Sequence, residues 1–166
     1  SIVNAVSGSA MASPDLPMHY PRMAANSSAV FAGGAPLDQQ TGVVVKLDAG
    51  KADFAVRQTL SEEIAALAAT EQYVIAASKR GMIFILSAQD LSVVRTIGTG
   101  TAMQVRDVIA MGNTLALVSF SDSDPSMPNA VYLIDGWLPG SVAAPFVPPP
   151  TAVTPQPPPQ AQQVAC

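Results

Sequence analysis

The chain is poor in the residues that most enzyme sites use. Its 166 residues include one histidine, one cysteine and one tryptophan, and only 12% of them are charged. His19 has no second group in the sequence with which it could form a histidine-based catalytic pair. Cys166 has no second cysteine, so an internal disulfide is excluded. It could bridge to another chain, carry a modification or be an inert end of the chain. We predict that the chain is not an enzyme and holds no cofactor.

Two further absences narrow the expected partners. The net charge is −4 and no stripe of lysine and arginine occurs. This argues against nucleic acid, which is bound by cations that neutralise phosphates. No run of about 18 apolar residues occurs, so we expect no transmembrane helix. Because 49% of the residues are apolar and few are charged, part of the surface should be covered by other protein chains.

What the sequence does contain is a repeated pattern of short apolar segments. In "YVIAASKRGMIFILSAQDLSVVRTI", residues 73–97, three apolar runs are separated by two polar turns. The first run is aromatic and β-branched, which is typical of a strand. Gly81 provides the positive φ that the first turn needs. "MIFIL", residues 82–86, is apolar at every position and therefore predicts a strand that is covered on both faces.

The same order of runs and turns recurs on both sides. Comparable segments begin at Ser28, Tyr73 and Thr114, which are 45 and 41 residues apart. Four antiparallel strands in about 40–45 residues are typical of a propeller blade. The alternatives are a β-sandwich or other antiparallel sheet and a mixed α/β fold, because residues 61–66 are good helix formers that could form one helical turn.

The pattern divides the chain into three parts. Residues 1–27 contain Pro14, Pro17 and Pro21 without any periodicity, and we expect an extended, irregular arm there. Residues 28–140 carry the propeller-like blades. Residues 141–166 are rich in proline and should form an extended tail. We therefore predict an all-β fold of antiparallel four-stranded repeats, as in a partial β-propeller.

Two stretches carry a family resemblance. Residues 73–97 and "NTLALVSFSDSDPSMPNAVYLIDG", residues 113–136, resemble blades of the quinoprotein/YVTN-type β-propellers, in which an apolar strand pair is followed by a turn and an outgoing strand. The Trp-Asp and Gly-His signatures of WD40 blades are absent. The tryptophan-docking motifs of the quinoprotein dehydrogenases are absent as well, so the resemblance does not imply their cofactor.

The number of blades leads to a functional hypothesis. Propellers usually need four to eight blades to close a ring, and this chain holds two complete blades and a third without a clear outer strand. Two apolar blade faces would then be left open, and copies of this chain or a second polypeptide should cover them. We expect a structural or interaction module that completes a larger extracytoplasmic assembly. The alternative is the non-catalytic part of a split propeller oxidoreductase or hydrolase whose active site lies on another chain.

Few polar residues stand out as site candidates. Glu63 could face the central channel near Arg106 or Asp107 of the next inner strand. Such a pair would either link two blades or anchor a ligand. Within the polar loop 121–129, oxygen ligands for Ca²⁺ could come from Asp122, Asp124 and Asn129, but the glycine and distant glutamate of an EF-hand loop are absent and we favour a solvated hairpin loop. Asn26 begins an Asn-Ser-Ser sequence that fits the N-glycosylation pattern of secreted eukaryotic chains.

Overall fold

The computed structural model describes residues 2–3, 10–11, 18–36, 41–48, 54–100, 104–120 and 129–140. Within these ranges the chain consists of β-strands and turns and contains no helix, so the all-β prediction is confirmed. None of the described segments therefore forms a helix that could span a lipid bilayer. The candidates Asp122, Asp124 and Cys166 lie outside the described residues.

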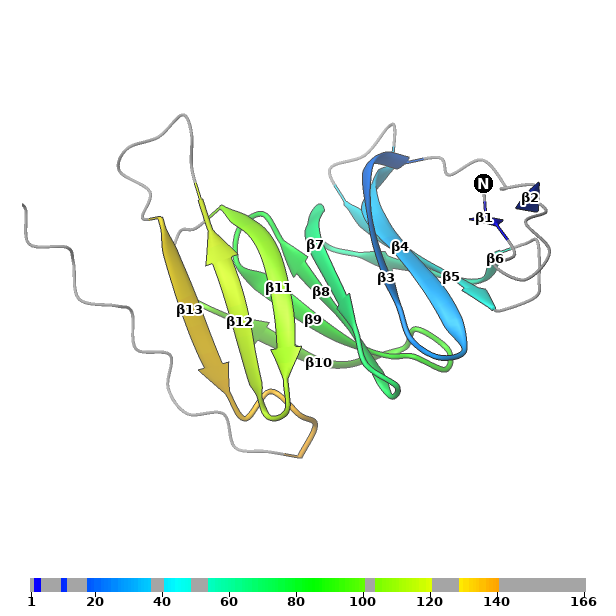
Figure 1. Ribbon diagram of the computed structural model, residues 1–166. Coiled ribbons are helices and arrows are strands. Elements are labelled where there is room, and N and C mark those ends of the chain that lie inside the picture. The colour runs from blue at the N-terminus through cyan, green and yellow to red at the C-terminus, as the bar shows by residue number, and fades with distance from the viewer. Residues whose placement is uncertain are drawn as a thin grey trace, which may run out of the picture.

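Eleven of the strands form three antiparallel sheets that are stacked face to face (Figure 1). The first sheet contains β3 (Met18–Ala25), β4 (Ala29–Pro36), β5 (Gly42–Asp48) and β6 (Phe54–Leu60). The second contains β7 (Ile64–Ala69), β8 (Tyr73–Ser78), β9 (Met82–Ser87) and β10 (Val93–Gly98). The third contains β11 (Val105–Met111), β12 (Thr114–Ser119) and β13 (Ala130–Asp135). Separately, β1 (Ile2–Val3) pairs with β2 (Ala10–Met11).

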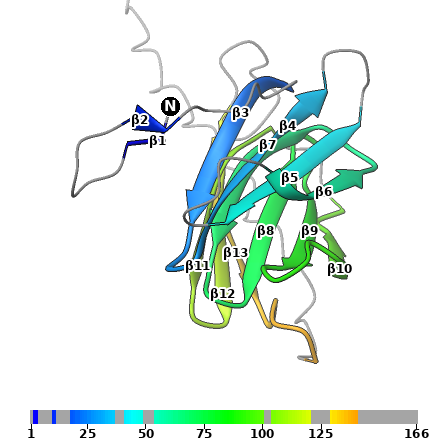
Figure 2. The ribbon, with the colours of Figure 1, turned by 90° about the vertical axis from the view of Figure 1, so that its right-hand side faces the viewer.

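Each sheet is a meander in which consecutive strands pair. Figure 2 looks along the stack from the first sheet, with the other two sheets behind it. The first strand of each sheet, which we call its inner strand, contacts the inner strand of the neighbouring sheet, with β7 between β3 and β11. Four-stranded meanders whose first strands lie side by side are the arrangement of propeller blades.

The second sheet is covered on both faces, which explains the continuous apolar runs of its central strands. Ile83 and Ile85 of β9 are fully buried on the side of the third sheet. Phe84 points the opposite way and is 5% exposed in the core between the first and second sheets. The expected burial of all three side chains is confirmed. The first two sheets also approach closely at Gly42, where a Cβ atom would overlap the main-chain oxygen of Glu62.

The inner strand of the first sheet is a difference from the sequence prediction. Residues 18–25 were expected to belong to an irregular arm, but they form β3. Pro21 is accommodated because the pairing of β3 with β4 shifts register between His19 and Arg22. In addition, β3 pairs with a neighbouring strand along one edge only. Proline is tolerated in edge strands and at bulges, where no ladder hydrogen bond is lost. The possible helical turn at 61–66 is also absent, since β7 begins at Ile64.

Candidate functional site

The third sheet presents an apolar face that no described part of the chain covers. Its side chains alternate, and one set, including Leu115, Leu117 and Tyr132, packs against the second sheet. The other set points away from the stack. We call this second set the open face. Its large side chains are about half exposed: Ile109 by 49%, Met111 by 50%, Val131 by 59% and Leu133 by 62%. Ile109 and Leu133 flank Ala116 in register, so these three side chains form one apolar row, while the neighbouring rows of the same face also contain Asp107 and Asp135.

The other end of the stack exposes less apolar surface. In the first sheet, Phe31 and Val44 point toward the second sheet. The alternate side chains form a separate apolar cluster on the far side, made of Met18, Ala32, Val43 and Val45. The members of this cluster are between 1% and 6% exposed. The expectation of two open apolar blade faces is therefore met only in part at this end: these four side chains are buried, whereas Met23, which lies opposite Ala32 in register on the same face, is 64% exposed.

The third sheet also ends in an unpaired strand. Among the described residues β13 pairs only with β12, and no fourth strand follows it. The two preceding sheets each have four strands. The edge of β13 therefore offers main-chain N–H and C=O groups beside the open face, where an outer strand would lie in a complete blade.

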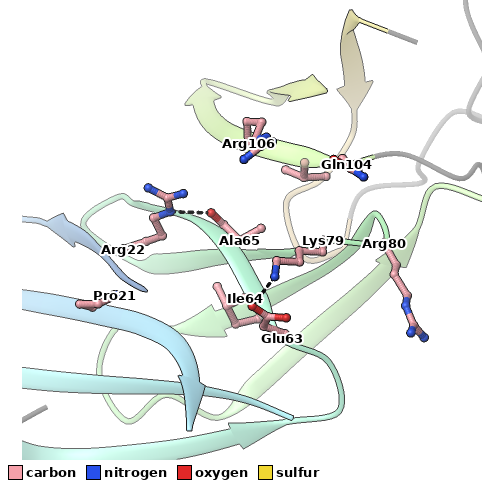
Figure 3. Close-up of a pocket in the computed structure, with 10 residues that line it drawn as sticks. Pro21, Arg22, Glu63, Ile64, Ala65, Lys79, Arg80, Gln104 and Arg106 are labelled. Carbon is pink, nitrogen blue, oxygen red and sulfur yellow. Dashed lines mark hydrogen bonds and ion pairs between the residues drawn. The ribbon is translucent and has the colours of Figure 1, made fainter. Parts of the chain in front are cut away.

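A cavity lies at the beginnings of the three inner strands. Each inner strand shifts register at the same place: between His19 and Arg22 in β3, between Ile64 and Ala66 in β7, and between Val105 and Asp107 in β11. Such bulges redirect side chains and occur frequently beside functional sites. The inner-strand cavity has a volume of about 780 Å³ and is lined by Pro21, Arg22, Glu63, Ile64, Ala65, Lys79, Arg80, Gln104, Val105 and Arg106 (Figure 3).

The polar contacts of the inner-strand cavity fix two guanidinium groups against the main chain. Arg22 Nε donates to the carbonyl oxygen of Ala65 at 2.9 Å, and Arg106 Nε donates to the carbonyl oxygen of Phe120 at 3.1 Å. Lys79 Nζ lies 2.6 Å from a carboxylate oxygen of Glu63. The ends of the three side chains Arg22, Lys79 and Arg106 lie around the inner-strand cavity, while Arg80 points away from the Glu63–Lys79 pair (Figure 3).

The predicted channel residues are only partly brought together. Glu63 and Arg106 both line the inner-strand cavity. Glu63 makes its ion pair with Lys79 of its own sheet, because the Lys79 N–H bonds to the Glu63 carbonyl oxygen at 3.3 Å and sets the two side chains side by side. Asp107 does not line the inner-strand cavity, and its carboxylate accepts from the N–H of Val108 at 2.8 Å. Sequence reasoning missed Arg22, because it placed that residue in an irregular arm.

The remaining candidates have structural surroundings. Asn26 Oδ1 accepts hydrogen bonds from Ser28 and Ala29 in the turn between β3 and β4, and its Nδ2 donates to the carbonyl oxygen of Thr70 at 3.1 Å. Glycosylation of Asn26 stays a prediction. Asn129 is exposed and directly precedes β13. The described residues contain no group of three or more histidine, cysteine or acidic side chains that could hold a metal ion.

Comparison with known proteins identifies the architecture. No protein-family profile and no curated protein sequence matches the chain. The β-propeller domain of Cps50 (Swd1) from Myceliophteria thermophila is similar in structure, with a TM-score of 0.53 and 18% identity over 77% of this chain and 38% of that domain. The Pan2 WD40 domain of Neurospora crassa gives a TM-score of 0.51 and 16% identity over 75% of this chain and 39% of that domain.

These similarities concern the fold. Both neighbours are β-propeller domains, and the chain spans less than two fifths of the length of each. The quinoprotein/YVTN type has no representative among these two neighbours. The three stacked sheets and their neighbouring inner strands have the architecture of part of a β-propeller.

Proposed function

We propose that the chain is a protein-interaction module whose open face packs against a further sheet supplied by another protein chain. The observation that carries this proposal is the contrast between the two ends of the stack. The apolar cluster on the outer face of the first sheet is buried and only Met23 beside it is an exposed large apolar side chain among the described residues of that sheet, whereas Ile109, Met111, Val131 and Leu133 of the third sheet are all about half exposed. Apolar side chains gathered on one surface are typical of protein-protein interaction sites.

The energy available on the open face indicates what the partner has to provide. Complete burial of a side chain of this size is worth about 1.5–3 kcal/mol, so covering four half-exposed ones is worth roughly 5 kcal/mol. Association costs an estimated 4–15 kcal/mol, so side-chain burial alone gives at best weak binding. The edge of β13 supplies more, since each net strand hydrogen bond contributes about 0.5–1.5 kcal/mol. The partner should therefore both cover the open face and add a strand beside β13.

The type of propeller, the location of the assembly and the nature of the partner are proposed from the sequence. We assign the blades to the quinoprotein/YVTN type because residues 73–97 and 113–136 resemble blades of that type. We place the assembly outside the cytoplasm on the strength of the low charge, the scarcity of cysteine and the proline-rich tail. The partner is another protein chain, either a second copy or a different polypeptide.

Sedimentation of the pure chain tests the proposal. We expect self-association at micromolar concentration if the partner is a second copy. If the partner is a different polypeptide, we expect a complex of larger native mass whose subunits can be identified after gentle extraction. Val131→Asp should weaken either association by at least about tenfold, because it places a charge in an apolar contact. Val94→Asp is the matched control, since Val94 is also exposed, by 44%, but lies on β10 of the second sheet.

One outcome would contradict the proposal. If the chain sediments as a compact monomer at micromolar concentration, and the native mass in its source is also that of the monomer, the open face has no partner. Equal effects of Val131→Asp and Val94→Asp on the association would likewise show that the contact lies elsewhere.

A further inference from the structure

We propose that the open face binds a different polypeptide, one that presents an apolar sheet face with lysine or arginine side chains opposite Asp107 and Asp135. This inference rests on the function proposed above and specifies the partner of the same surface. It depends on where the two carboxylates lie, on the hydrogen bonds that hold them, and on the charges that surround them.

The two carboxylates lie at diagonally opposite corners of the open face. Asp107 lies on β11, in the row of the face that ends at Val131 on β13. Asp135 lies on β13, in the row that begins at Met111 on β11. The apolar row through Ala116 runs between these two rows. The two aspartates are therefore four residues apart along the strands and two strands apart across the sheet, which separates their Cα atoms by roughly 16 Å.

Each carboxylate is held by the sheet through one of its oxygens. Asp107 Oδ1 accepts from the N–H of Val108 at 2.8 Å, and Asp135 Oδ1 accepts from the hydroxyl of Thr114 on the neighbouring strand. Both aspartate side chains are exposed. Within the described part of the chain, neither aspartate forms an ion pair and neither Oδ2 atom accepts a hydrogen bond. Carboxylates oriented in this way can accept charge-assisted hydrogen bonds from a lysine or arginine of another chain.

The open face has no cation of its own for these carboxylates. Among the described residues of the third sheet, Arg106 is the only lysine or arginine, and it lines the inner-strand cavity. A partner that covers the open face takes Asp107 and Asp135 at least partly out of water. Removing a charge from water is costly when no counter-ion replaces the water, and the cost is offset when a hydrogen-bonded cation does. The partner should therefore bring the basic side chains itself.

A second copy of the chain does not match this pattern. Two copies that meet through the open face use the same surface, related by a two-fold axis. Four carboxylates then enter one contact without a lysine or arginine to pair with them. Whether the axis runs along the strands or across them, aspartates of the two copies lie at the same end of the contact, where they repel each other. Like charges brought together across a contact select against that partner. A different polypeptide with basic side chains at these corners avoids both costs.

Mixing the chain with its own charge-reversed variant tests the inference. Asp107→Lys/Asp135→Lys keeps the apolar row of the open face and places cations at its two corners, so this variant serves as the probe partner. In analytical ultracentrifugation, the equimolar mixture should associate at least about tenfold more tightly than either protein alone, because each carboxylate meets a lysine at the same end of the contact. Added salt should reduce the difference, because charges at the edge of a contact are screened.

A neutral variant tests the same argument without introducing lysine. Asp107→Asn/Asp135→Asn removes both charges and should self-associate at least about threefold more tightly than the wild type, because no carboxylate then has to leave water. Val131→Asp in the wild-type member should weaken the association of the mixture, which places the contact on the open face. Circular dichroism should show unchanged folding of every variant.

Glu71→Lys/Asp90→Lys is the matched control. Both side chains are exposed, and they lie in the turns before β8 and after β9 of the second sheet, away from the open face. The double change alters the net charge by the same amount as the charge reversal on the open face. Mixing this variant with the wild type should change the association by no more than about twofold, as expected for screened charges outside the contact.

Three results would overturn the inference. The first is the absence of association in the mixture at millimolar concentration, together with equal self-association of the wild type and the asparagine variant. The second is an equal gain with the control variant, which would indicate that net charge alone acts. The third is self-association of the wild type that is as tight as that of the mixture and is weakened by Val131→Asp.

The third result separates the two proposals. The function proposed above would then stand, with a second copy as the partner, and only the inference about basic side chains would fail. If the mixture associates but Val131→Asp in the wild-type member has no effect, the contact lies away from the open face and both proposals fail.

Discussion

Trp137 should be the residue that holds the third sheet against the second. Its side chain is 1% exposed and meets Tyr73 of β8 edge-on, with ring centroids 5.9 Å apart and an interplanar angle of 83°. Its Nε1 donates to the carbonyl oxygen of Gly112 at 2.9 Å. The main chain on either side of it is also held, because Arg95 of β10 donates to the carbonyl oxygens of Gly136 and Leu138 at 2.6 and 2.9 Å.

The magnitude of the effect follows from these contacts. Trp137→Ala should lower the free energy of unfolding by about 3–5 kcal/mol, the usual cost of removing a buried aromatic side chain. Domains of ordinary stability have only about 5–15 kcal/mol in total. Trp137→Phe keeps a ring against Tyr73 and removes the N–H donor, so it should lose roughly 1 kcal/mol from the hydrogen bond besides the smaller buried area.

Urea unfolding followed by far-UV circular dichroism measures both variants. Because Trp137 is the only tryptophan, the fluorescence of the wild-type chain reports directly on this contact, and it should change in the same transition. Val94→Ala is the control, since exposed substitutions usually change stability by less than about 0.5 kcal/mol. If Trp137→Ala unfolds at the same urea concentration as Val94→Ala, the segment after β13 does not hold the two sheets together.

The remaining predictions concern the core, the contact between the first two sheets and the turn after β9. Phe84→Ala should lower the free energy of unfolding by about 3–5 kcal/mol in urea, and Ile83→Asp should prevent folding; a stable Ile83→Asp variant would contradict the burial of β9 on both faces. Gly42→Ala should lower the free energy of unfolding in the same assay, because its Cβ would overlap the main-chain oxygen of Glu62. A Gly42→Ala variant as stable as the wild type would show that the chain can move apart here at no cost. The hydroxyl of Ser92 lowers the pKa of Asp90 below its usual value of 3.8, so an NMR titration should find a lower midpoint for this carboxyl. Since the folded-state pKa is the lower one, the contribution of Asp90 to stability is present above pH 3.8 and disappears as the pH falls through the folded-state pKa, and Asp90→Asn should remove this pH dependence.

The sequence was most informative where a strand is buried on both faces. The runs that became β8 and β9 are apolar at almost every position, and a continuous apolar run bounded by turn residues allows few other structures. The repeat spacing then indicated the neighbouring sheets. At β3 the local signals failed, because Pro17, Pro21 and the adjoining small polar residues are typical of loops. The pairing with β4 and the contact with β7 override those local preferences, and neither is visible in a window of a few residues.

The lining of the inner-strand cavity was also hard to predict, because it depends on contacts between strands that are distant in the sequence. Glu63 and Arg106 were placed near the channel because two inner strands had been identified. Arg22 could not be added, since its place depends on a strand that the sequence did not indicate. The partner of Glu63 was also missed, because the Glu63–Lys79 pair depends on the antiparallel pairing of β7 with β8 and not on sequence distance. The exposure of the open face and the burial of the apolar cluster on the first sheet likewise depend on tertiary packing.

The buried apolar cluster on the outer face of the first sheet limits how far the chain can grow by contact with itself. Filaments need two different complementary surfaces on each subunit, so that every addition leaves a new surface for the next. Among the described residues, the larger exposed apolar surface lies at one end of the stack, on Ile109, Met111, Val131 and Leu133, whereas the apolar cluster at the other end is buried apart from Met23 beside it. If two copies meet through this face, they meet as a two-fold pair that leaves no equivalent face for a third. Self-association through this surface should therefore stop at a dimer and should not lead to fibres, even at high protein concentration.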